Sequence, residues 1–466
     1  MKPAAGSQVA QFLSSIESGD LGCLNINLNQ NGRLVAELQA ELLNGLSDKD
    51  IEAFVENRRF EGGKWTRFNM LIVSFMRYCK DVNPWSLWES SDLIFNYYQD
   101  LTNCILNDNF PVDPLVTIFQ STTEYVIPLA RELDSKYREI DTREHQFLTH
   151  ISSVVTKLFN SIKPRYEKPT VRFEELPQKQ QILLYTANKL NNIYMQIGSP
   201  ASCANIFKNV KPKSAIESFS QYPVHEQIEY RYLLGRYYML NHRVSNAFHQ
   251  LNSAYSLLVK YTANTAADPS VQRNKQRILR FLLPVGILFG KTPMNLEHQF
   301  LHGSGSESTH KYLELSHIVK SGCLRRFHVW MAQHEDELRR QKLLLLLLEK
   351  CPLLIYRSLF RRVIVDFCFS NDSNKISYAF LEIALRISLG SPQGLKPIYT
   401  MVHVPENVPN ALESLVNIGL MKANCFPLSK QCVFPKAKKI DFIFPSVNEK
   451  LVAFFPFNGD DVWLDN

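Results

Sequence analysis

Six consecutive leucines at residues 343–348 constrain the fold of this chain more than any other feature of its sequence. The run is too short to span a bilayer, which needs about 20 apolar residues, and charged side chains bracket it closely at both ends. Consecutive residues of a helix point in all directions around its axis, so the leucines predict a segment that is buried on several sides. Pro352 follows and is predicted to end the helix. We therefore expect a structural joint here and not a membrane segment.

The composition is that of a globular chain with more than one domain. Of the 466 residues, 45% are apolar and 21% are charged, and a single core stops growing near about 250–300 residues, so two or three domains are expected. The formal net charge of +7 permits a polyanionic partner without requiring one. The nine cysteines include no C-x-x-C pair, which favours a reducing compartment over a disulfide framework or a zinc site. No secretory signal is expected, because the first 20 residues contain no long apolar stretch.

Most of the sequence has the apolar spacing of helices. The aromatic-rich segment 84–98 is predicted to pack in a core. Residues 161–179 contain three prolines and many charges, which is typical of a linker. The predicted organisation is an N-terminal helical region at 1–160, the linker at 161–179, a helical-repeat part at 180–350, a winged helix at 351–440 and a C-terminal tail at 441–466.

Residues 226–240 and 244–261 have the spacing of a tetratricopeptide helix pair. Small and groove-filling side chains occur where two such helices meet: Leu234, Gly235, Tyr238, Ala247 and Ala254. The sequence therefore predicts one degenerate repeat in a stack of helical hairpins. Such stacks are right-handed solenoids whose curved surfaces bind other proteins.

The pattern changes after the leucine run. Helices are expected at about 356–369, 376–389 and 406–418, and two short strands at 420–426 and 431–434. Three helices and a terminal hairpin are the outline of a winged helix, a relative of helix-turn-helix modules. The predicted fold class is thus mostly α: a tetratricopeptide-like, right-handed solenoid of helical hairpins followed by a winged-helix subdomain.

No motif predicts catalysis. The stretch PVGILFGKT at 284–292 is one residue short of a phosphate loop and continues a helical pattern, so Gly290 is interpreted as the end of a helix. His298 and His302 have the spacing of two metal ligands on one helix face, but no third ligand lies at a recognisable spacing. We expect a protein that is not an enzyme, with no catalytic residue, no metal site and no cofactor.

The basic residues near the predicted hairpin are more informative. Five lysines and no acidic residue lie between positions 422 and 439. A wing that presents lysines can reach phosphate groups through contacts that depend on salt but not on nucleotide sequence. The alternative is a solvated basic edge that only keeps the hairpin from pairing with other sheets. The candidate nucleic-acid-binding residues are Lys422, Lys430, Lys436, Lys438, Lys439, Arg361 and Arg362.

The order of helical hairpins, leucine-rich helix and winged helix resembles that of a PCI domain. Particular stretches are similar to the fungal form of the PCI-domain subunit of transcription-and-export complex 2, a family of nuclear mRNA export. These stretches are NLNQNGR (27–33), VNPWSLWESSDLIF (82–95), HQFLTHISSVVTKLFNSIKP (145–164), KLNNIYMQIGSPASCANIFKN (189–209), EQIEYRYLLGRYYMLN (226–241), RILRFLLPVGILFGK (277–291), LLLLLLEKCPLLIYRSLFRRVI (343–364) and LVNIGLMKANCFPLSKQCVF (415–434).

The resemblance implies a non-enzymatic scaffold subunit of a nuclear hetero-oligomer that couples transcription to mRNA export at the nuclear pore. In that family the PCI module pairs with a second PCI module in a GANP-type scaffold subunit, and the two winged helices form a basic surface for RNA, with DNA as a second candidate. No membrane partner is implied.

A small, acidic, mostly disordered subunit, shared with the proteasome lid, completes the assembly that the resemblance implies. By charge complementarity alone, a basic group could meet this acidic subunit: Arg273, Lys275, Arg277 and Arg280. Two other hypotheses stay open. One is a PCI scaffold of a proteasome-lid or signalosome-type complex that does not bind nucleic acid, and the other is a cryptic enzyme.

Overall fold

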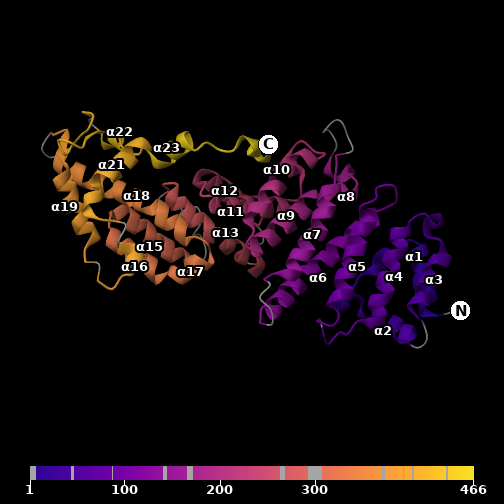
Figure 1. Cartoon of the computed structure of the whole chain (residues 1–466). Coiled ribbons are helices and arrows are strands. Elements are labelled where there is room, and N and C mark those ends of the chain that lie inside the picture. The colour runs from indigo at the N-terminus through magenta and orange to yellow at the C-terminus, as the bar shows by residue number, and fades with distance from the viewer. Residues whose placement is uncertain are drawn as a thin grey trace. The chain divides into compact units, whose positions relative to one another are not determined.

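The computed structural model describes residues 7–43, 47–86, 88–139, 144–164, 172–262, 268–291, 307–369, 373–391, 393–400, 403–436 and 439–465. The chain is mostly helical and divides into two compact units (Figure 1). One unit consists of Met1–Glu226 with Trp463–Asn466, and the other of Gln227–Val462. Among the described residues, no helix is long and apolar enough to cross a membrane. The boundaries of the five predicted segments remain a prediction.

The first unit is a succession of helices that pack mostly on helices one or two positions away in the chain, such as α4 on α5, α2 on α4 and α7 on α9. Its helices are α1 (Gln8–Glu17), α2 (Leu28–Leu43), α3 (Asp48–Arg58), α4 (Thr66–Asp81), α5 (Ser91–Ile105), α6 (Asp113–Tyr137), α7 (Gln146–Ser161), α8 (Gln178–Gln181), α9 (Leu183–Gln196) and α10 (Cys203–Lys213). Short 3-10 helices lie at Leu21–Leu24, Phe60–Gly63, Phe173–Glu175, Pro200–Ser202 and Phe219–Gln221. Contacts of this local kind are those of stacked helical hairpins.

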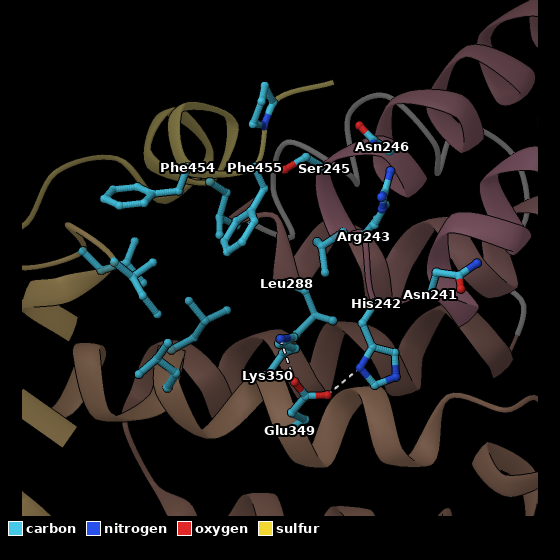
Figure 2. A pocket seen from close by; sticks show the side chains of 17 residues that line it. Asn241, His242, Arg243, Ser245, Asn246, Leu288, Glu349, Lys350, Phe454 and Phe455 are labelled. Carbon is cyan, nitrogen blue, oxygen red and sulfur yellow. Dashed lines mark ion pairs between the residues drawn. The ribbon is translucent and has the colours of Figure 1, made fainter. Parts of the chain in front are cut away.

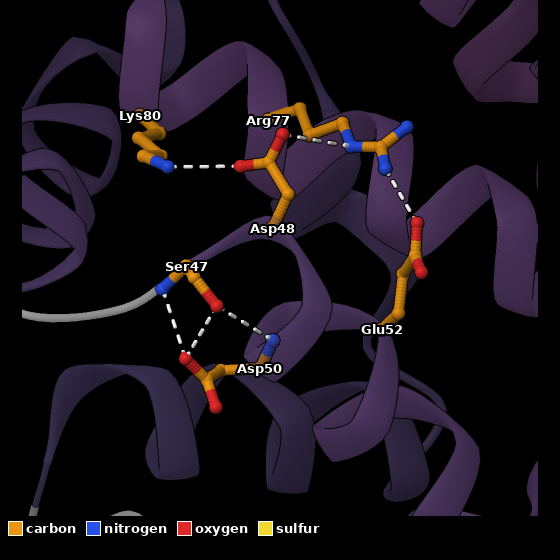
Figure 3. Close-up of polar contacts among 6 residues, drawn as sticks. All are labelled: Ser47, Asp48, Asp50, Glu52, Arg77 and Lys80. Atoms are coloured by element: carbon orange, nitrogen blue, oxygen red, sulfur yellow. Dashed lines mark hydrogen bonds and ion pairs between the residues drawn. The ribbon is translucent and has the colours of Figure 1, made fainter.

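The start of α3 shows how local sequence defines a helix end. Ser47 and Asp50 form a capping box, in which the Ser47 hydroxyl accepts from the Asp50 amide and the Asp50 carboxylate accepts from the Ser47 amide (Figure 3). Three exposed ion pairs join this helix to α4: Asp48 with Lys80 at 2.8 Å, Asp48 with Arg77 at 3.9 Å and Glu52 with Arg77 at 2.5 Å. Since these pairs are exposed, each contributes at most about 1 kcal/mol, and the buried helix faces dominate the packing.

The aromatic-rich segment 84–98 only partly packs in a core. Tyr97 and Tyr98 of α5 are fully buried, as predicted, but Trp85 is 95% exposed. The Trp85 amide donates to the Asn83 side chain at 3.0 Å, in a turn that precedes the helix. Trp85 therefore lies outside the helical face that carries Tyr97 and Tyr98 inward, and Trp88, which also precedes the helix, is 48% exposed.

The second unit contains the predicted helix pair and the winged helix. Its helices are α11 (Val224–Leu240, which begins just before the unit), α12 (Val244–Tyr261), α13 (Pro269–Leu288), α15 (Glu307–Ser321), α16 (Leu324–Gln333), α17 (Glu335–Arg340), α18 (Leu344–Ile364), α19 (Tyr378–Leu389), α20 (Pro397–Thr400), α21 (Val408–Asn417), α22 (Ile440–Ile443) and α23 (Val447–Phe454). A π-helical turn, Val365–Phe369, follows α18, and 3-10 segments lie at Pro405–Asn407 and Gly459–Asp465, of which the last three residues belong to the first unit.

The helix pair α11 and α12 packs as the sequence predicts. A Cβ atom on Gly235 would lie 2.7 Å from Leu251 Cγ, so only glycine allows this approach of the two helices. Ala247 and Ala254 are fully buried, and Leu234 is 1% exposed. The arginine that replaces the usual tryptophan of the repeat, Arg231, is also buried, and it donates to Gln250 on α12 at 3.0 Å.

The leucine run forms the start of α18, which is the joint that the sequence predicts. This helix contacts α13, α15, α16 and α17 on one side and α19 and α21 of the winged helix on the other. Leu343, Leu346 and Leu347 are at most 1% exposed, but Leu345 is 70% exposed. The run is therefore buried on several sides without being buried on all of them.

The predicted end of this helix at Pro352 is wrong, because α18 continues through Pro352 to Ile364. A proline inside a helix removes one backbone hydrogen bond and costs about 3 kcal/mol. Here the flanking residues are packed too tightly for the helix to bend away, since Cys351 and Ile355 are fully buried. The helix expected at about 356–369 is accordingly the second half of α18 and not a separate element.

The winged helix contains a three-stranded antiparallel sheet in the order β1-β3-β2. Its strands are β1 (Lys375–Ser377), β2 (Asn424–Phe426) and β3 (Gln431–Val433). The two hairpin strands were predicted, but β1 was not, because its three residues stand directly before a helix and resemble its first turn. Ser377 ends this strand and also caps α19, because its hydroxyl accepts a hydrogen bond from the Ala379 amide. With this addition, the predicted fold class, a stack of helical hairpins followed by a winged helix, is confirmed.

Candidate functional site

The loop between β2 and β3 ends in an exposed lysine, directly before β3. Lys430 is exposed and has a positive φ of +50°, a conformation that turns the chain into β3. Its carbonyl accepts from the Tyr378 amide at 2.9 Å, so the backbone at the loop end is held by the first residue of α19. The side chain is thereby fixed at its base and free to reach outward.

The other lysines of the group lie around the base of the same hairpin. Lys422 is exposed, its amide donates to the Ile443 carbonyl at 2.8 Å, and its ammonium lies 4.0 Å from the centroid of the Phe442 ring. Lys436 and Lys439 are exposed as well. Lys438 lies outside the described residues. The structure thus places four of the five predicted lysines, exposed, on the hairpin or on the segments directly before and after it.

The two arginines of the predicted group already have protein partners. Arg362 donates to the Ser321 carbonyl at 2.9 Å. This carbonyl lies at the C-terminal end of α15, where the helix dipole also stabilises a cation. Arg361 lies 3.4 Å from the Asp441 carboxylate in an exposed pair. Nucleic-acid contact by either arginine remains a prediction, and for Arg362 it would have to compete with the helix end.

A third arginine of α18 has a structural role that the sequence did not reveal. Arg357 is mostly buried and donates to the carbonyls of Leu420, Phe444 and Pro445, at 3.4, 3.1 and 2.7 Å. Its guanidinium also lies over the Phe444 ring. Burial, together with the charge of Arg361, lowers the pKa of Arg357 to about 10, which still leaves it protonated at neutral pH. Arg357 therefore holds the segment after the lysine group against α18.

A shallow cavity of about 510 Å³ lies beside the outer edge of the wing. It is bounded by Gly419, Met421 and Asn424 at the base of the hairpin and by Phe434 and Pro435 after it. Two lysines from separate segments, Lys422 and Lys450, also line it. β2 is one of the two edge strands of the sheet, so no further strand covers this side of the hairpin. An extended anion can therefore lie along the groove.

The basic residues of α13 form a second surface, on a different helix. Arg273, Arg277 and Arg280 are exposed and spaced by four and three residues, so they share one helical face. Lys275 is half-buried and lies on another side of the helix. The structure therefore brings together three of the four residues that the sequence suggested for an acidic partner.

A larger pocket of about 580 Å³ lies between α12, α13, α18, α21 and the C-terminal segment of the second unit. Figure 2 shows Phe454 and Phe455 on one side and the polar group of His242, Glu349 and Lys350 on the other. The Glu349 carboxylate lies 2.5 Å from His242 and 2.7 Å from Lys350, and the ammonium of Lys350 and the imidazole hold the pKa of Glu349 below its ordinary value.

The walls of this pocket are mainly aliphatic and aromatic, including Leu353, Ile418 and Leu451. Such a lining suits an apolar side chain better than a polar reactant. The sequence could not indicate this pocket, because its walls come from five segments spread over more than 200 positions.

The described residues also give no support for catalysis. They contain no group of three or more His, Cys, Asp or Glu side chains arranged to hold a metal ion. His298 and His302, the pair with metal-ligand spacing, lie outside the described residues. The expectation that the protein has no metal and no cofactor remains an expectation.

Comparison with known proteins identifies relatives of this chain. No protein-family model matches the sequence. The chain is 42% identical over 461 residues, 97% of its length and 99% of the relative's, to the nuclear mRNA export protein THP1 of Saccharomyces cerevisiae. It is 23% identical over 84% of its length, and 83% of the relative's, to a PCI domain-containing protein of Schizosaccharomyces pombe. It is 27% identical to the protein CSN12 homolog of Neurospora crassa, over 46% of each chain.

Stacked helical hairpins joined through one long helix to a winged helix, in a chain with these relatives, define a PCI-domain protein. The extent of the similarity to the Saccharomyces protein is more specific. The chain belongs to the family of the nuclear mRNA export protein THP1. The resemblance seen in the sequence is thereby confirmed.

Proposed function

We propose that this chain is a scaffold subunit of a nuclear complex that exports mRNA. The observation that carries the proposal is the 42% identity to the nuclear mRNA export protein THP1 over nearly the full length of both chains. At this level of similarity the two share their architecture and the order of their elements. None of the relatives compared above is named as an enzyme, which agrees with a scaffold that does no chemistry.

The finer part of the proposal concerns nucleic acid. The basic wing, which we define as Lys422, Lys430, Lys436, Lys438 and Lys439, contacts the phosphate backbone of RNA. Four of these lysines are exposed, and they lie on or beside a hairpin whose backbone is fixed by the sheet. Lysines of this kind bind phosphates without reading bases, so the expected binding is salt-sensitive and tolerant of sequence.

The implied partners complete the proposal. A GANP-type scaffold subunit would bring a second PCI module beside this one, and a small acidic subunit would meet the basic face of α13 formed by Arg273, Arg277 and Arg280. The assembly would lie in the nucleus, at the nuclear pore, and couple transcription to export. The support for these partners is the family relationship and the charge of the α13 face.

Affinity purification tests the scaffold function. The tagged full-length chain is isolated from nuclear extract, and the co-purifying proteins are identified by mass spectrometry. The proposal predicts a large subunit with its own PCI module, together with mRNA-export proteins. Recovery of proteasome-lid or signalosome subunits without export proteins would favour the second hypothesis, a PCI scaffold without a nucleic-acid role.

Ultraviolet cross-linking tests the wing separately. The purified complex is irradiated with bound RNA and digested, and the cross-linked peptides are mapped. Cross-links should concentrate between residues 422 and 450, and they should fall when the basic wing is neutralised. If cross-links map instead to the basic face of α13, the assignment of the wing to nucleic acid is wrong, whatever the purification shows.

A further inference from the structure

Two cysteines of the wing face each other across the hairpin. Cys425 on β2 is directly opposite Cys432 on β3 in the register of the sheet, and their sulfurs are 4.0 Å apart. Cys425 is half-buried and Cys432 is fully buried.

The backbone hydrogen bonds of the sheet define the kind of site in which this pair lies. The Tyr378 amide donates to the Lys430 carbonyl, and the Phe434 amide donates to the Asn374 carbonyl, at 2.9 and 2.8 Å. Polar groups of alternate residues along a strand point to the same side, so the backbone of Cys432, midway between them, also faces β1. Its pairing with β2 is therefore a non-hydrogen-bonded one.

This geometry is compatible with a disulfide. Directly opposed residues at a non-hydrogen-bonded site have Cα atoms about 4.5 Å apart, inside the range of about 4.4–6.8 Å that a disulfide spans. Side-chain rotation can bring the two sulfurs together without a change of register. Four residues connect the strands, so the bond would close the hairpin at the base of its loop.

Cys425 is the more accessible of the two, because it is half-buried while Cys432 is fully buried. The Cys432 thiol, and next the Tyr378 hydroxyl, hold the pKa of Cys425 below its ordinary value, although burial acts in the opposite direction. At another half-buried cysteine, Cys23, burial raises the pKa to about 12. Since the thiolate is the form that reacts with peroxides, Cys425 has a larger reactive fraction than Cys23 at neutral pH.

We propose that Cys425 and Cys432 form a peroxide-sensitive dithiol, and that its oxidation to a disulfide locks the wing hairpin. The Cys425 thiolate attacks an oxygen of hydrogen peroxide, the O–O bond breaks, and a sulfenic acid and water result after one proton is taken up. The Cys432 sulfur then attacks the Cys425 sulfur, the S–O bond breaks, and the hydroxyl group leaves with the Cys432 proton as water. In sum, two thiols and one peroxide give one disulfide and two waters.

The proposed disulfide is a property of the wing hairpin itself, and it does not depend on the proposed contact with RNA. The same hairpin carries Lys430 at the end of its loop, and Phe426 at the end of β2 and Leu428 in the loop are exposed. A covalent bond between β2 and β3 would restrict opening of the strands next to this loop. A thiol reductant would break the bond and restore the hairpin without the cross-link.

Peptide mapping tests the dithiol in the full-length protein. Reduced protein is treated with hydrogen peroxide, remaining thiols are blocked with N-ethylmaleimide, and the protein is digested with trypsin, which cuts after Lys422, Lys430 and Lys436. Peptides 423–430 and 431–436 should then appear as one linked species, two hydrogens lighter than their sum and separated by dithiothreitol. Cys23 should be oxidised at least tenfold more slowly than Cys425.

Single variants separate the roles of the two sulfurs. In Cys432→Ser, a sulfenic acid should accumulate at Cys425 and be trapped by dimedone. In Cys425→Ser, the buried Cys432 should stay reduced over the same exposure. Oxidation should also slow hydrogen exchange of residues 424–433 in the wild type and leave it unchanged in Cys425→Ser.

Three results would overturn the inference. These are oxidation of Cys23 as fast as Cys425, linkage of either wing cysteine only to a second molecule, and unchanged hydrogen exchange in the oxidised hairpin. Because each readout is a property of the hairpin, a protein that fails to bind RNA can still pass or fail this test.

Discussion

A comparison of Leu347→Ala with Leu345→Ala tests the role of α18 as the joint. The two leucines are two positions apart in the same run, but Leu347 is fully buried while Leu345 is 70% exposed. Removal of a buried leucine side chain costs about 2–5 kcal/mol through lost transfer energy and the cavity that remains. We therefore expect Leu347→Ala to lower the free energy of unfolding by about 3 kcal/mol. For Leu345→Ala the change should stay within about 0.5 kcal/mol.

Thermal unfolding of the purified full-length protein measures this difference. For a unit of roughly 200 residues, 1 kcal/mol corresponds to about 2–4 °C, so Leu347→Ala should lower the midpoint of the second unit by about 6–12 °C. Hydrogen exchange should localise the loss of protection to α18 and to the helices that it contacts. If the two variants have equal midpoints, or if Leu345→Ala is the less stable of the two, the burial pattern of the joint is wrong.

Three further substitutions probe the second unit. Arg357→Met should cost about 2–4 kcal/mol, because three carbonyls lose a charged donor, and limited proteolysis should cut residues 440–465 faster than in the wild type. Gly290→Ala should destabilise by about 1–3 kcal/mol, since Gly290 has a φ of +81° and an added Cβ would lie 2.6 Å from Val447; a melting point equal to the wild type would contradict this contact. His328 is buried and stacks on His403, and burial, with the charge of His403, lowers its pKa to about 4. Between these two pH values His328 is protonated in the unfolded chain but neutral in the folded chain. The free energy of unfolding should therefore fall by about 2 kcal/mol as the pH drops from about 6.5 to 4. His328→Phe should show a smaller fall over the same range, and an identical pH dependence of the melting point would count against the assignment.

The helices and the class of fold could be predicted because their signals are local. The pair α11 and α12 follows from spacing alone, and the role of Gly235 follows from its size. The end of α13 at Leu288, just before Gly290, follows from the conformational freedom of glycine. In each case the determining residues lie within one or two turns of the feature.

The errors arise where tertiary packing overrides a local signal. Pro352 is a helix breaker by local rules, but packing on several sides of α18 keeps the helix continuous. β1 has only three residues, and its strand conformation depends on pairing with β3, which lies more than 50 positions further along the chain. Trp85 shares its neighbours' aromatic character but lies in a turn.

Of the candidate site, the sequence predicted only where the basic residues cluster. The run of lysines marks the wing in the sequence, and its exposure agrees with a solvent-facing surface. The partners of Arg357 and Arg362 are backbone carbonyls of distant segments, and a sequence does not encode such pairings in a readable form. The position of Cys425 directly opposite Cys432 likewise depends on the register of the hairpin, which the sequence alone left open.

The central claim is that the basic wing binds the nucleic-acid backbone, and the salt dependence of RNA affinity tests it most directly. For single strands, the logarithm of the binding constant falls by about 0.7 per phosphate contact for each tenfold rise in salt. Binding of single-stranded RNA is titrated at several salt concentrations with the wild-type complex and with a variant whose five wing lysines are glutamine. A matched control carries Arg273→Gln, Arg277→Gln and Arg280→Gln on α13.

The wing variant is expected to lose affinity, and its salt slope should become shallower by up to about 3.5, or about 0.7 for each of the five lysines, while the α13 control keeps the wild-type slope. Equal slopes and affinities for the wild type and the wing variant would show that these lysines do not contact RNA.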